Sequence, residues 1–291
     1  MTVLRFAPAL GDWVRQHLDQ GQPPAALIQT MRERGMDDDA AQAIVAAFMR
    51  ARHDGTPWPI DRVEVAPDER EPPRLRRGSR IAAHDRTVRV AARAERPVLA
   101  LLSEVIDAAE CAELIEMARG RLEPSTLVDP ASGRDVVSGL RASSGMFFRP
   151  FENALVARLD RRLAQIMNLP VEHGEGLQVL HYPSGAGSAP HHDFLLPTNA
   201  ANQASIARSG QRVSTMVTYL NDVPEGGETL FPEAGWAVSP QRGNAVYFEY
   251  CNRHGELDHA SLHGSNAVRQ GEKWVATKWM RARPFVSAGA A

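Results

Sequence analysis

Two histidines and one aspartate in this sequence could together hold a metal ion. His191 and Asp193 lie two residues apart, and alternate side chains of a strand point to the same face. His263 lies much further along the chain and could supply a third ligand from another strand. Two imidazoles and one carboxylate on one face of an octahedral metal leave three positions open, which suits non-haem Fe(II).

The short H-x-D motif is weak evidence on its own, so two alternatives stay open. His259 and His263 are four residues apart, a spacing that can bind zinc on a helix. Gly264 and the strand-like residues around it argue against a helix there. A zinc hydrolase and a binding protein without catalysis are therefore the competing interpretations.

Lys273 adds a cation to this set. In the segment 273–280 a period of two places Lys273, Val275, Thr277 and Trp279 on one face. If that face lines the interior of a barrel, the ammonium is buried, which is costly unless an anion pairs with it. Glu272 points the other way, so an exogenous dicarboxylate is the natural partner. The alternative is a solvated lysine at a strand end, since most lysines are exposed.

The composition is that of an ordinary globular protein. The 291 residues are 43% apolar and carry a net charge of −2, which excludes wholesale disorder and gives no support for binding nucleic acid through overall charge. We find no stretch long enough to span a membrane and no signal-peptide pattern at the start. Cys111 and Cys251 cannot form a disulfide framework. We therefore expect a cytoplasmic protein with no nucleic-acid or membrane partner.

The chain divides by composition into three parts. Residues 1–52 show apolar residues at helical spacing, with breaks at Pro23–Pro24 and Gly35, and predict a small all-α bundle of three helices. Residues 53–79 are rich in proline and charge, which is typical of an extended linker. Residues 80–291 would form the main domain.

The main domain is predicted to be α+β. A strand is expected at 96–102, then a helix with Asp107 as N-cap and Glu110 completing a capping box. Cys111 falls on the buried stripe of that helix, and a second helix follows at about 152–167. Period-two segments then predict strands at 177–182, 213–220, 244–250 and 273–280. Helices followed by strands favour a sheet closed into a barrel or sandwich.

Taken together, these segments resemble the 2-oxoglutarate- and Fe(II)-dependent dioxygenases of the prolyl 4-hydroxylase family. The resemblance covers about residues 95–285, and the pieces come in family order: RPVLALLSEVIDAAECAELI, GLQVLHY, APHHDF, RVSTMVTYLNDVPEGGETLF, VSPQRGNAVYF, DHASLHGSNAV and GEKWVATKW. The resemblance implies a double-stranded β-helix, or jelly roll, with supporting helices.

The resemblance also implies a role for each matching residue. The residues that would bind iron and form the catalytic centre are His191, Asp193 and His263. The residues that would contact 2-oxoglutarate are Lys273, which pairs with its distal carboxylate, Tyr182 and Thr215. The residues that would line the substrate side are Arg212 and Trp279.

The implied activity is that of a hydroxylase that uses Fe(II), 2-oxoglutarate and O2, with ascorbate as a candidate reductant, and releases succinate and CO2. Its substrate would be a prolyl residue or something similar in a peptide, protein or small molecule. The alternative is a catalytically silent binding protein that keeps the fold and docks partners through residues 1–52. We expect that bundle to contact a partner or to form a homodimer, because three short helices bury little area.

One position departs from the family pattern. Peptide-hydroxylating relatives tend to have an aromatic residue three positions before the first ligand histidine, where this chain has Ser188. An aromatic ring would pack against a proline ring, and serine cannot. The polar segment at 196–210 is expected to be a loop over the site.

Overall fold

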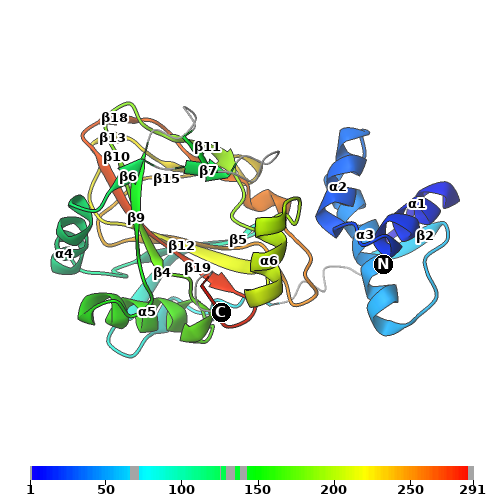
Figure 1. Cartoon of the computed structure of the whole chain (residues 1–291), viewed down its shortest axis with the longest axis horizontal. Helices are drawn as coiled ribbons and strands as arrows, with labels where there is room; N and C mark the ends of the chain where they lie inside the picture. The colour runs from blue at the N-terminus through cyan, green and yellow to red at the C-terminus, as the bar shows by residue number, and fades with distance from the viewer. Residues whose placement is uncertain (1, 66–71, 125, 129–134, 138–142, 288–291) are drawn as a thin grey trace. The chain divides into compact units, whose positions relative to one another are not determined.

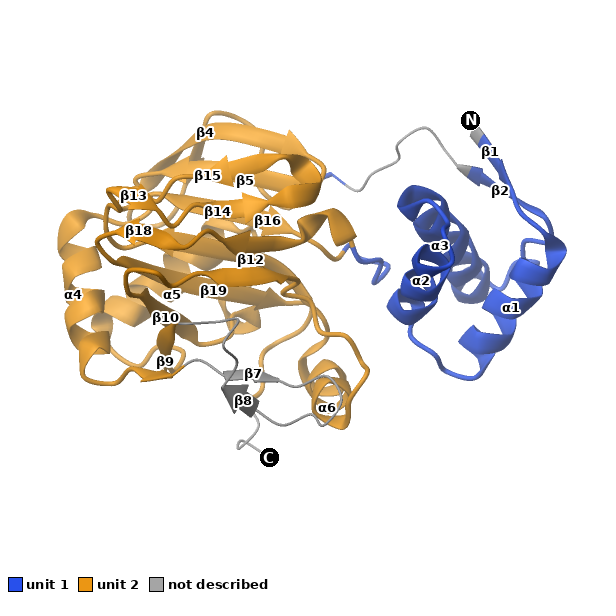
Figure 2. Cartoon of the chain, turned by 90° about the horizontal axis from the view of Figure 1, so that it is seen from above, with its two compact units in different colours: residues 1–72, 252–257 blue, residues 73–251, 258–291 orange. Residues whose placement is uncertain are grey.

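The computed structural model describes residues 2–65, 72–124, 126–128, 135–137 and 143–287. The chain forms two compact units (Figure 2). The first comprises residues 1–72 and 252–257, and the second comprises residues 73–251 and 258–291. Among the described residues, none of the helices is both long and apolar enough to cross a membrane.

The N-terminal unit contains the three predicted helices and a small sheet. Its elements are β1 (Thr2–Arg5), α1 (Pro8–Asp19), α2 (Pro24–Glu33), α3 (Asp38–Asp54) and β2 (Arg62–Val65). The prediction of an all-α bundle is therefore wrong, because β1 and β2 pair as antiparallel strands. The second strand lies inside the segment 53–79 that we expected to be a linker, of which residues 66–71 fall outside the described residues.

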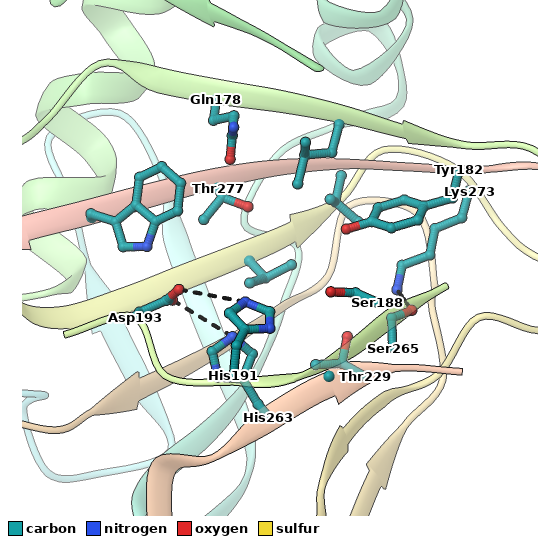
Figure 3. A pocket seen from close by; sticks show the side chains of 15 residues that line it. Gln178, Tyr182, Ser188, His191, Asp193, Thr229, His263, Ser265, Lys273 and Thr277 are labelled. Carbon is teal, nitrogen blue, oxygen red and sulfur yellow. Dashed lines mark hydrogen bonds and ion pairs between the residues drawn. The ribbon is translucent and has the colours of Figure 1, made fainter. Parts of the chain in front are cut away.

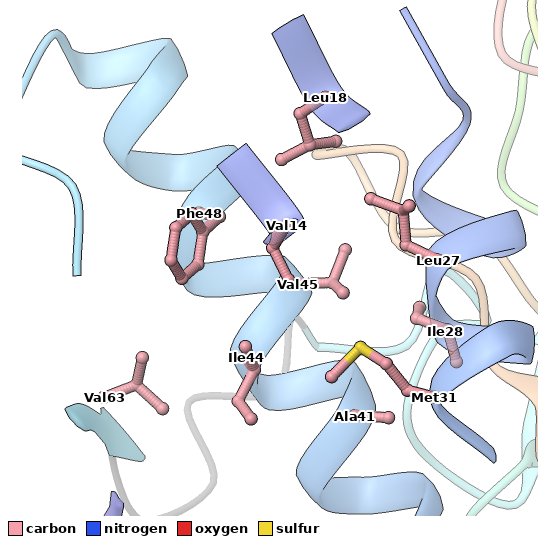
Figure 4. Close-up of a cluster of buried hydrophobic side chains, with 10 residues drawn as sticks. All are labelled: Val14, Leu18, Leu27, Ile28, Met31, Ala41, Ile44, Val45, Phe48 and Val63. Atoms are coloured by element: carbon pink, nitrogen blue, oxygen red, sulfur yellow. The ribbon is translucent and has the colours of Figure 1, made fainter. Parts of the chain in front are cut away.

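Local sequence signals explain the helix boundaries in this unit. A proline stands in the first turn of α1 and of α2, where its missing N–H costs nothing. The Asp37 side chain accepts a hydrogen bond from the Ala40 amide at the start of α3, and Gly55 ends that helix in the left-handed region at φ 65°. The buried core between the helices (Figure 4) consists of Val14, Leu18, Leu27, Ile28, Met31, Ala41, Ile44, Val45, Phe48 and Val63.

The second unit contains two antiparallel sheets. The larger has nine strands in the order β3-β4-β5-β16-β12-β19-β10-β9-β6, which are β3 (Arg80–Ala82), β4 (Thr87–Glu95), β5 (Val98–Ser103), β6 (Glu123–Pro124), β9 (Ser144–Phe148), β10 (Leu177–Tyr182), β12 (Arg212–Tyr219), β16 (Ala245–Glu249) and β19 (Lys273–Arg281). The smaller has four strands in the order β11-β17-β14-β15, which are β11 (Ser188–His191), β14 (Thr229–Phe231), β15 (Trp236–Val238) and β17 (His263–Ser265). Two further pairs are β7 (Thr126–Val128) with β8 (Asp135–Val137), and β13 (Glu225–Gly226) with β18 (Val268–Gln270).

Two helices cover the outer face of the nine-stranded sheet (Figure 1). They are α4 (Ala108–Arg119), which places the Arg119 guanidinium over the ring of Trp274, and α5 (Ala154–Ile166), whose Asp160 forms an ion pair with Lys278 at 2.7 Å. The predicted capping box is present at α4, because Asp107 and Glu110 each accept a hydrogen bond from the other's backbone amide. Both faces of β19 are consequently buried along its whole length.

The α+β class and the large antiparallel sheet are confirmed, and two local predictions need correction. Strands β3 and β4 precede the first strand that we predicted in this unit. The polar segment at 196–210, expected to be a loop, contains helix α6 (Ala200–Ser209). Its N-cap is Asn199, whose side chain accepts a hydrogen bond from the Asn202 amide.

Candidate active site

A cavity that is open to solvent lies between the two sheets of the second unit (Figure 3). Alternate residues of two neighbouring strands line it. These are Gln178, Leu180 and Tyr182 of β10, and Lys273, Val275, Thr277 and Trp279 of β19. The predicted period of two along 273–280 is therefore confirmed, and Lys273 and Trp279 both belong to the cavity wall.

The structure brings His191, Asp193 and His263 together at this cavity (Figure 3). One ligand atom from each lies within 4.8 Å of the others. Nε2 of His191 is 3.8 Å from Oδ1 of Asp193, and Nε2 of His263 is 3.7 Å from Oδ2 of the same carboxylate. His191 ends β11, Asp193 follows that strand, and His263 begins the neighbouring strand β17. Two nitrogens and one oxygen of this kind can hold a divalent first-row metal.

Backbone carbonyl groups fix the orientation of both imidazole rings. Nδ1 of His191 lies 2.9 Å from the Ala189 carbonyl oxygen, and Nδ1 of His263 lies 3.1 Å from that of Ser261. A carbonyl oxygen can only accept, so each Nδ1 carries the proton and each Nε2 keeps its lone pair. This is the second shell that metal-binding histidines normally have.

A hydroxyl pair supports the aspartate. The Thr215 hydroxyl donates to Oδ2 of Asp193 at 2.7 Å. It lies 2.9 Å from the Tyr250 hydroxyl, which must donate to Thr215 because the Thr215 proton is already used. The resemblance suggested a cosubstrate contact for Thr215. The structure places it behind the carboxylate, outside the residues that line the cavity.

The electrostatics of the three residues favour a cation between them. Burial alone would raise the pKa of Asp193, but His263, His191 and Arg212 lower it to about 2. Burial lowers the pKa of His263 to about 4. At neutral pH the site therefore presents an ionised carboxylate and a neutral His263 imidazole, which is the protonation state that metal binding needs.

Lys273 is buried, as we predicted, at one end of the cavity. Its Nζ donates to the Gly227 carbonyl at 2.6 Å and to the Ser265 hydroxyl at 2.8 Å. Gly226 and Gly227 adopt positive φ, and a Cβ at Gly226 would lie 2.3 Å from the Ala267 carbonyl, so the turn needs glycine there. Among the described residues, the ammonium forms an ion pair with none of the carboxylates. Burial lowers its pKa to about 7, against a weaker opposing effect of Glu228.

Tyr182 pairs with Lys273 across β10 and β19, and the ammonium lies 5.3 Å from the centre of its ring. Thr229 and Ser265 also line the cavity at the Lys273 end and were not predicted from the sequence. Ser265 could have been found, because it follows His263 by two residues on the same strand and so shares its face. Thr229 comes from β14 and accepts a hydrogen bond from the Tyr219 hydroxyl at 2.8 Å, a contact between distant segments without a local signal.

Arg212 and Trp279, the predicted substrate-side pair, stack on each other. The guanidinium carbon lies 4.2 Å from the centre of the indole. Trp279 lines the cavity, whereas Arg212 is not among the lining residues. The Arg212 guanidinium donates to both carboxylate oxygens of Glu175, at 2.7 and 2.8 Å. Glu175 also accepts from Arg281 at 3.0 Å. Glu175 was not predicted, because no local pattern marks an acid that pairs with two distant arginines.

The alternative of a zinc site formed by His259 and His263 on one helix is wrong. His259 lies in a 3-10 turn, and His263 lies in a strand. The metal-binding group found among the described residues does not include His259. Ser188, which replaces the expected aromatic residue, does line the cavity.

Comparisons with known proteins agree with this geometry. Residues 177–281 match the family model described as the 2OG-Fe(II) oxygenase superfamily. The chain is 40% identical to prolyl 4-hydroxylase 1 of Arabidopsis thaliana, over 64% of this chain and 69% of that protein. It is 37% identical to probable prolyl 4-hydroxylase 10 of the same plant, over 60% of this chain and 66% of that protein. The chain thus spans about two thirds of the length of these curated relatives.

A solved structure shows the same fold. The viral collagen prolyl hydroxylase from Paramecium Bursaria Chlorella virus-1, solved as its 2OG complex, superposes with a TM-score of 0.50 at 24% identity. The match covers 63% of this chain and 96% of that protein. The chain therefore contains the fold of that hydroxylase.

Proposed function

Since the chain belongs to the prolyl 4-hydroxylase family of 2OG-Fe(II) oxygenases, we propose that it is an Fe(II)- and 2-oxoglutarate-dependent hydroxylase that acts on prolyl residues or closely similar groups and releases succinate and CO2. The observation that supports this most strongly is the joint placement of His191, Asp193, His263 and Lys273 at one cavity. The two sheets that face each other across that cavity fit the double-stranded β-helix that we expected.

His191, Asp193 and His263 would hold the metal. Bound there, iron(II) would supply, with O2 and 2-oxoglutarate, the oxidising chemistry that inserts oxygen into an unactivated C–H bond. The Ala189 and Ser261 carbonyls keep both Nε2 atoms directed at the metal position, and Thr215 holds the carboxylate. The residues themselves therefore need little rearrangement when the metal binds.

Lys273 would bind the distal carboxylate of 2-oxoglutarate. Its ammonium donates to two neutral oxygens, from Gly227 and Ser265, and has room to pair with an anion that enters the cavity. Tyr182 and Thr229 would complete this end of the site with hydroxyl groups. Leu180 and Val275 lie between the polar ends of the cavity and would exclude water from the middle of the bound diacid.

The proposed partners are a peptide, protein or small-molecule substrate, O2 as oxidant and ascorbate as reductant. The names of the curated relatives favour a prolyl substrate. Ser188 leaves more room beside the metal site than an aromatic ring would, so a substrate with more than a proline ring fits this proposal. We also propose that the N-terminal unit contacts a partner protein or a second copy of the chain.

A turnover assay tests the activity. Oxygen-dependent succinate release should fall at least about a hundredfold in His191→Ala and in Asp193→Ala, since even second-shell changes cost 10–100-fold. The control is His53→Ala, an exposed histidine of the N-terminal unit. A screen of prolyl peptides should show a mass gain of one oxygen atom in the product.

Full succinate release by both variants would contradict the proposal. Calorimetry with 2-oxoglutarate and Mn(II) in place of iron separates a hydroxylase from a silent binding protein, because absence of binding in the wild-type protein would favour the latter. Activity under nitrogen without a keto acid would indicate a hydrolase instead.

A further inference from the structure

Tyr250 is a buried tyrosine next to the candidate metal site, outside the residues that line the cavity. It directly follows β16 and is 1% exposed. Its ring packs against those of Phe194 and Phe248, whose centres lie 6.1 and 5.9 Å away. Buried tyrosines usually place the hydroxyl on a hydrogen-bond partner. The partner of this hydroxyl is Thr215, which itself holds a candidate metal ligand.

The Tyr250 hydroxyl reaches Asp193 through one intermediate. It donates to the Thr215 hydroxyl at 2.9 Å, and Thr215 donates to Oδ2 of Asp193 at 2.7 Å. Burial raises the pKa of Tyr250 well above its ordinary value, so the hydroxyl keeps its proton at neutral pH. A hydroxyl that accepts one hydrogen bond is polarised into a stronger donor for the next. Tyr250 therefore strengthens the bond that fixes the rotation of the Asp193 carboxylate.

The backbone of Tyr250 is tied to the segment that carries His263. Its amide donates to the Val213 carbonyl of β12 at 3.1 Å, and its carbonyl accepts from the Asp258 amide at 2.9 Å. The Asp258 carbonyl accepts from the amide and the hydroxyl of Ser261, at 3.2 and 2.6 Å. The carbonyl of that serine orients the His263 ring. Tyr250 is thus connected to two candidate ligands by separate routes, one through its side chain and one through its main chain.

We propose that Tyr250 is a positioning residue of the metal centre, whose hydroxyl acts through Thr215 on Asp193 and so sets how tightly the site binds a divalent metal. The inference rests on the proposed function. It adds to that function a residue outside the cavity wall, because the chain of hydrogen bonds begins at Tyr250 and ends on the carboxylate.

Binding of Co(II) to the full-length protein tests the inference without turnover. Calorimetry measures the affinity, and the visible absorption of bound Co(II) reports its coordination geometry. Thr215→Val removes the hydroxyl at nearly constant shape and should lower Co(II) affinity by about 10–100-fold. Tyr250→Phe should lower it by about fivefold, because one hydrogen bond of ordinary strength is lost. Both variants should shift the Co(II) absorption in the same direction.

A double-mutant cycle shows whether Tyr250 acts through Thr215. In the Thr215→Val background, Tyr250→Phe should have no further effect on Co(II) affinity, because the route to Asp193 is already broken. Thr215→Ser keeps the hydroxyl and should restore both the affinity and the fivefold effect of Tyr250→Phe. A purely structural contribution of the Tyr250 hydroxyl would not depend on the hydroxyl of its neighbour.

Tyr247→Phe is the matched control. Tyr247 is 0% exposed and lies in β16. Its neighbour Phe248 faces the site, with its ring 4.6 Å from that of His263, so Tyr247 points to the opposite face of the sheet. Loss of this buried hydroxyl should leave Co(II) affinity and absorption unchanged. Thermal unfolding of the metal-free proteins checks that each variant is folded, and Tyr250→Met, which also lacks the hydroxyl, replaces Tyr250→Phe if that variant is not.

Three results would overturn the inference. They are a Tyr250→Phe protein with the Co(II) affinity and absorption of the wild-type protein, a fivefold loss that persists in the Thr215→Val background, and an equal loss in Tyr247→Phe. Failure of the wild-type protein to bind Co(II) at all would instead overturn the proposed function.

Discussion

At the scale of single residues, hydrogen bonds within the protein orient the candidate metal ligands. Each histidine has one nitrogen committed to a backbone carbonyl, and the aspartate has one oxygen committed to Thr215. The remaining atoms converge within 4.8 Å. Lys273 differs from these three, because its two hydrogen-bond partners in the described part of the chain are neutral, and Glu228 offsets only part of the effect of burial on its charge.

Lys273 should make 2-oxoglutarate binding depend on pH. Its pKa is lowered by burial to about 7 in the free protein, and a bound carboxylate would raise it again because the charged form is then paired. Below pH 7 the ammonium is already charged and affinity should be constant. Above pH 7 binding must take up a proton, so affinity should fall by about tenfold per pH unit. Calorimetry with Mn(II) between pH 6.5 and 9 in buffers of different ionisation enthalpy measures both effects.

The Lys273→Arg variant is the matched control. A guanidinium stays charged throughout this range, so whatever its affinity, that affinity should lose its dependence on pH. A wild-type protein whose affinity for 2-oxoglutarate is the same at pH 7 and pH 9 would contradict the prediction.

At the scale of elements, the predictions held where the pattern was strong and local. The alternation of β10 and β19 placed Tyr182, Lys273 and Trp279 at the cavity, and the capping box placed the start of α4. β3 and β4 were missed although their burial alternates, because β3 has only three residues and β4 is rich in alanine, which has a low strand propensity. Helix α6 was missed because Asn199 and the polar residues after it are also typical of loops.

The capping box of α4 supplies a test of stability at this scale. Asp107→Ala removes the acceptor for the Glu110 amide, which should lower the free energy of unfolding by about 1 kcal/mol, within the usual range of about 0.5–2. The pair of Asp107 with Arg86 is partly exposed and should add little. Urea unfolding followed by circular dichroism measures the change.

Glu113→Ala, at an exposed position in the same helix, is the control and should change the stability by less than about 0.5 kcal/mol. The same loss in both variants would show that the cap contributes nothing specific. Succinate release should be unaffected in either variant, since α4 lies on the face of the sheet away from the cavity.

At the scale of the whole molecule, the N-terminal unit has its own core. Ten buried residues from its helices and from β2 form one cluster. The sequence predicted the three helices through their spacing, but not the β1–β2 pair, because each strand has four residues and they are separated by the whole bundle. Such a contact between distant short segments leaves no periodic signal.

The two units should therefore respond separately to a change in one core. Phe48 is 1% exposed, and Phe48→Ala should destabilise the N-terminal unit by about 3–5 kcal/mol. Differential scanning calorimetry should show one transition lowered by this variant and another raised by Mn(II) with 2-oxoglutarate. A single transition that responds to both would mean that the units unfold together.

Strand β19 spans the whole site. Lys273 lies at the start of the strand and Trp279 near its end, and both line the cavity. The residues between them are buried on both faces of the strand. A one-residue insertion or deletion within it would swap its two faces from that point onward. The lysine and the indole would then no longer face the same chamber, and Trp274 or Lys278 would be turned into it. We therefore expect this strand to keep its length during evolution, while relatives diverge in the connections around it.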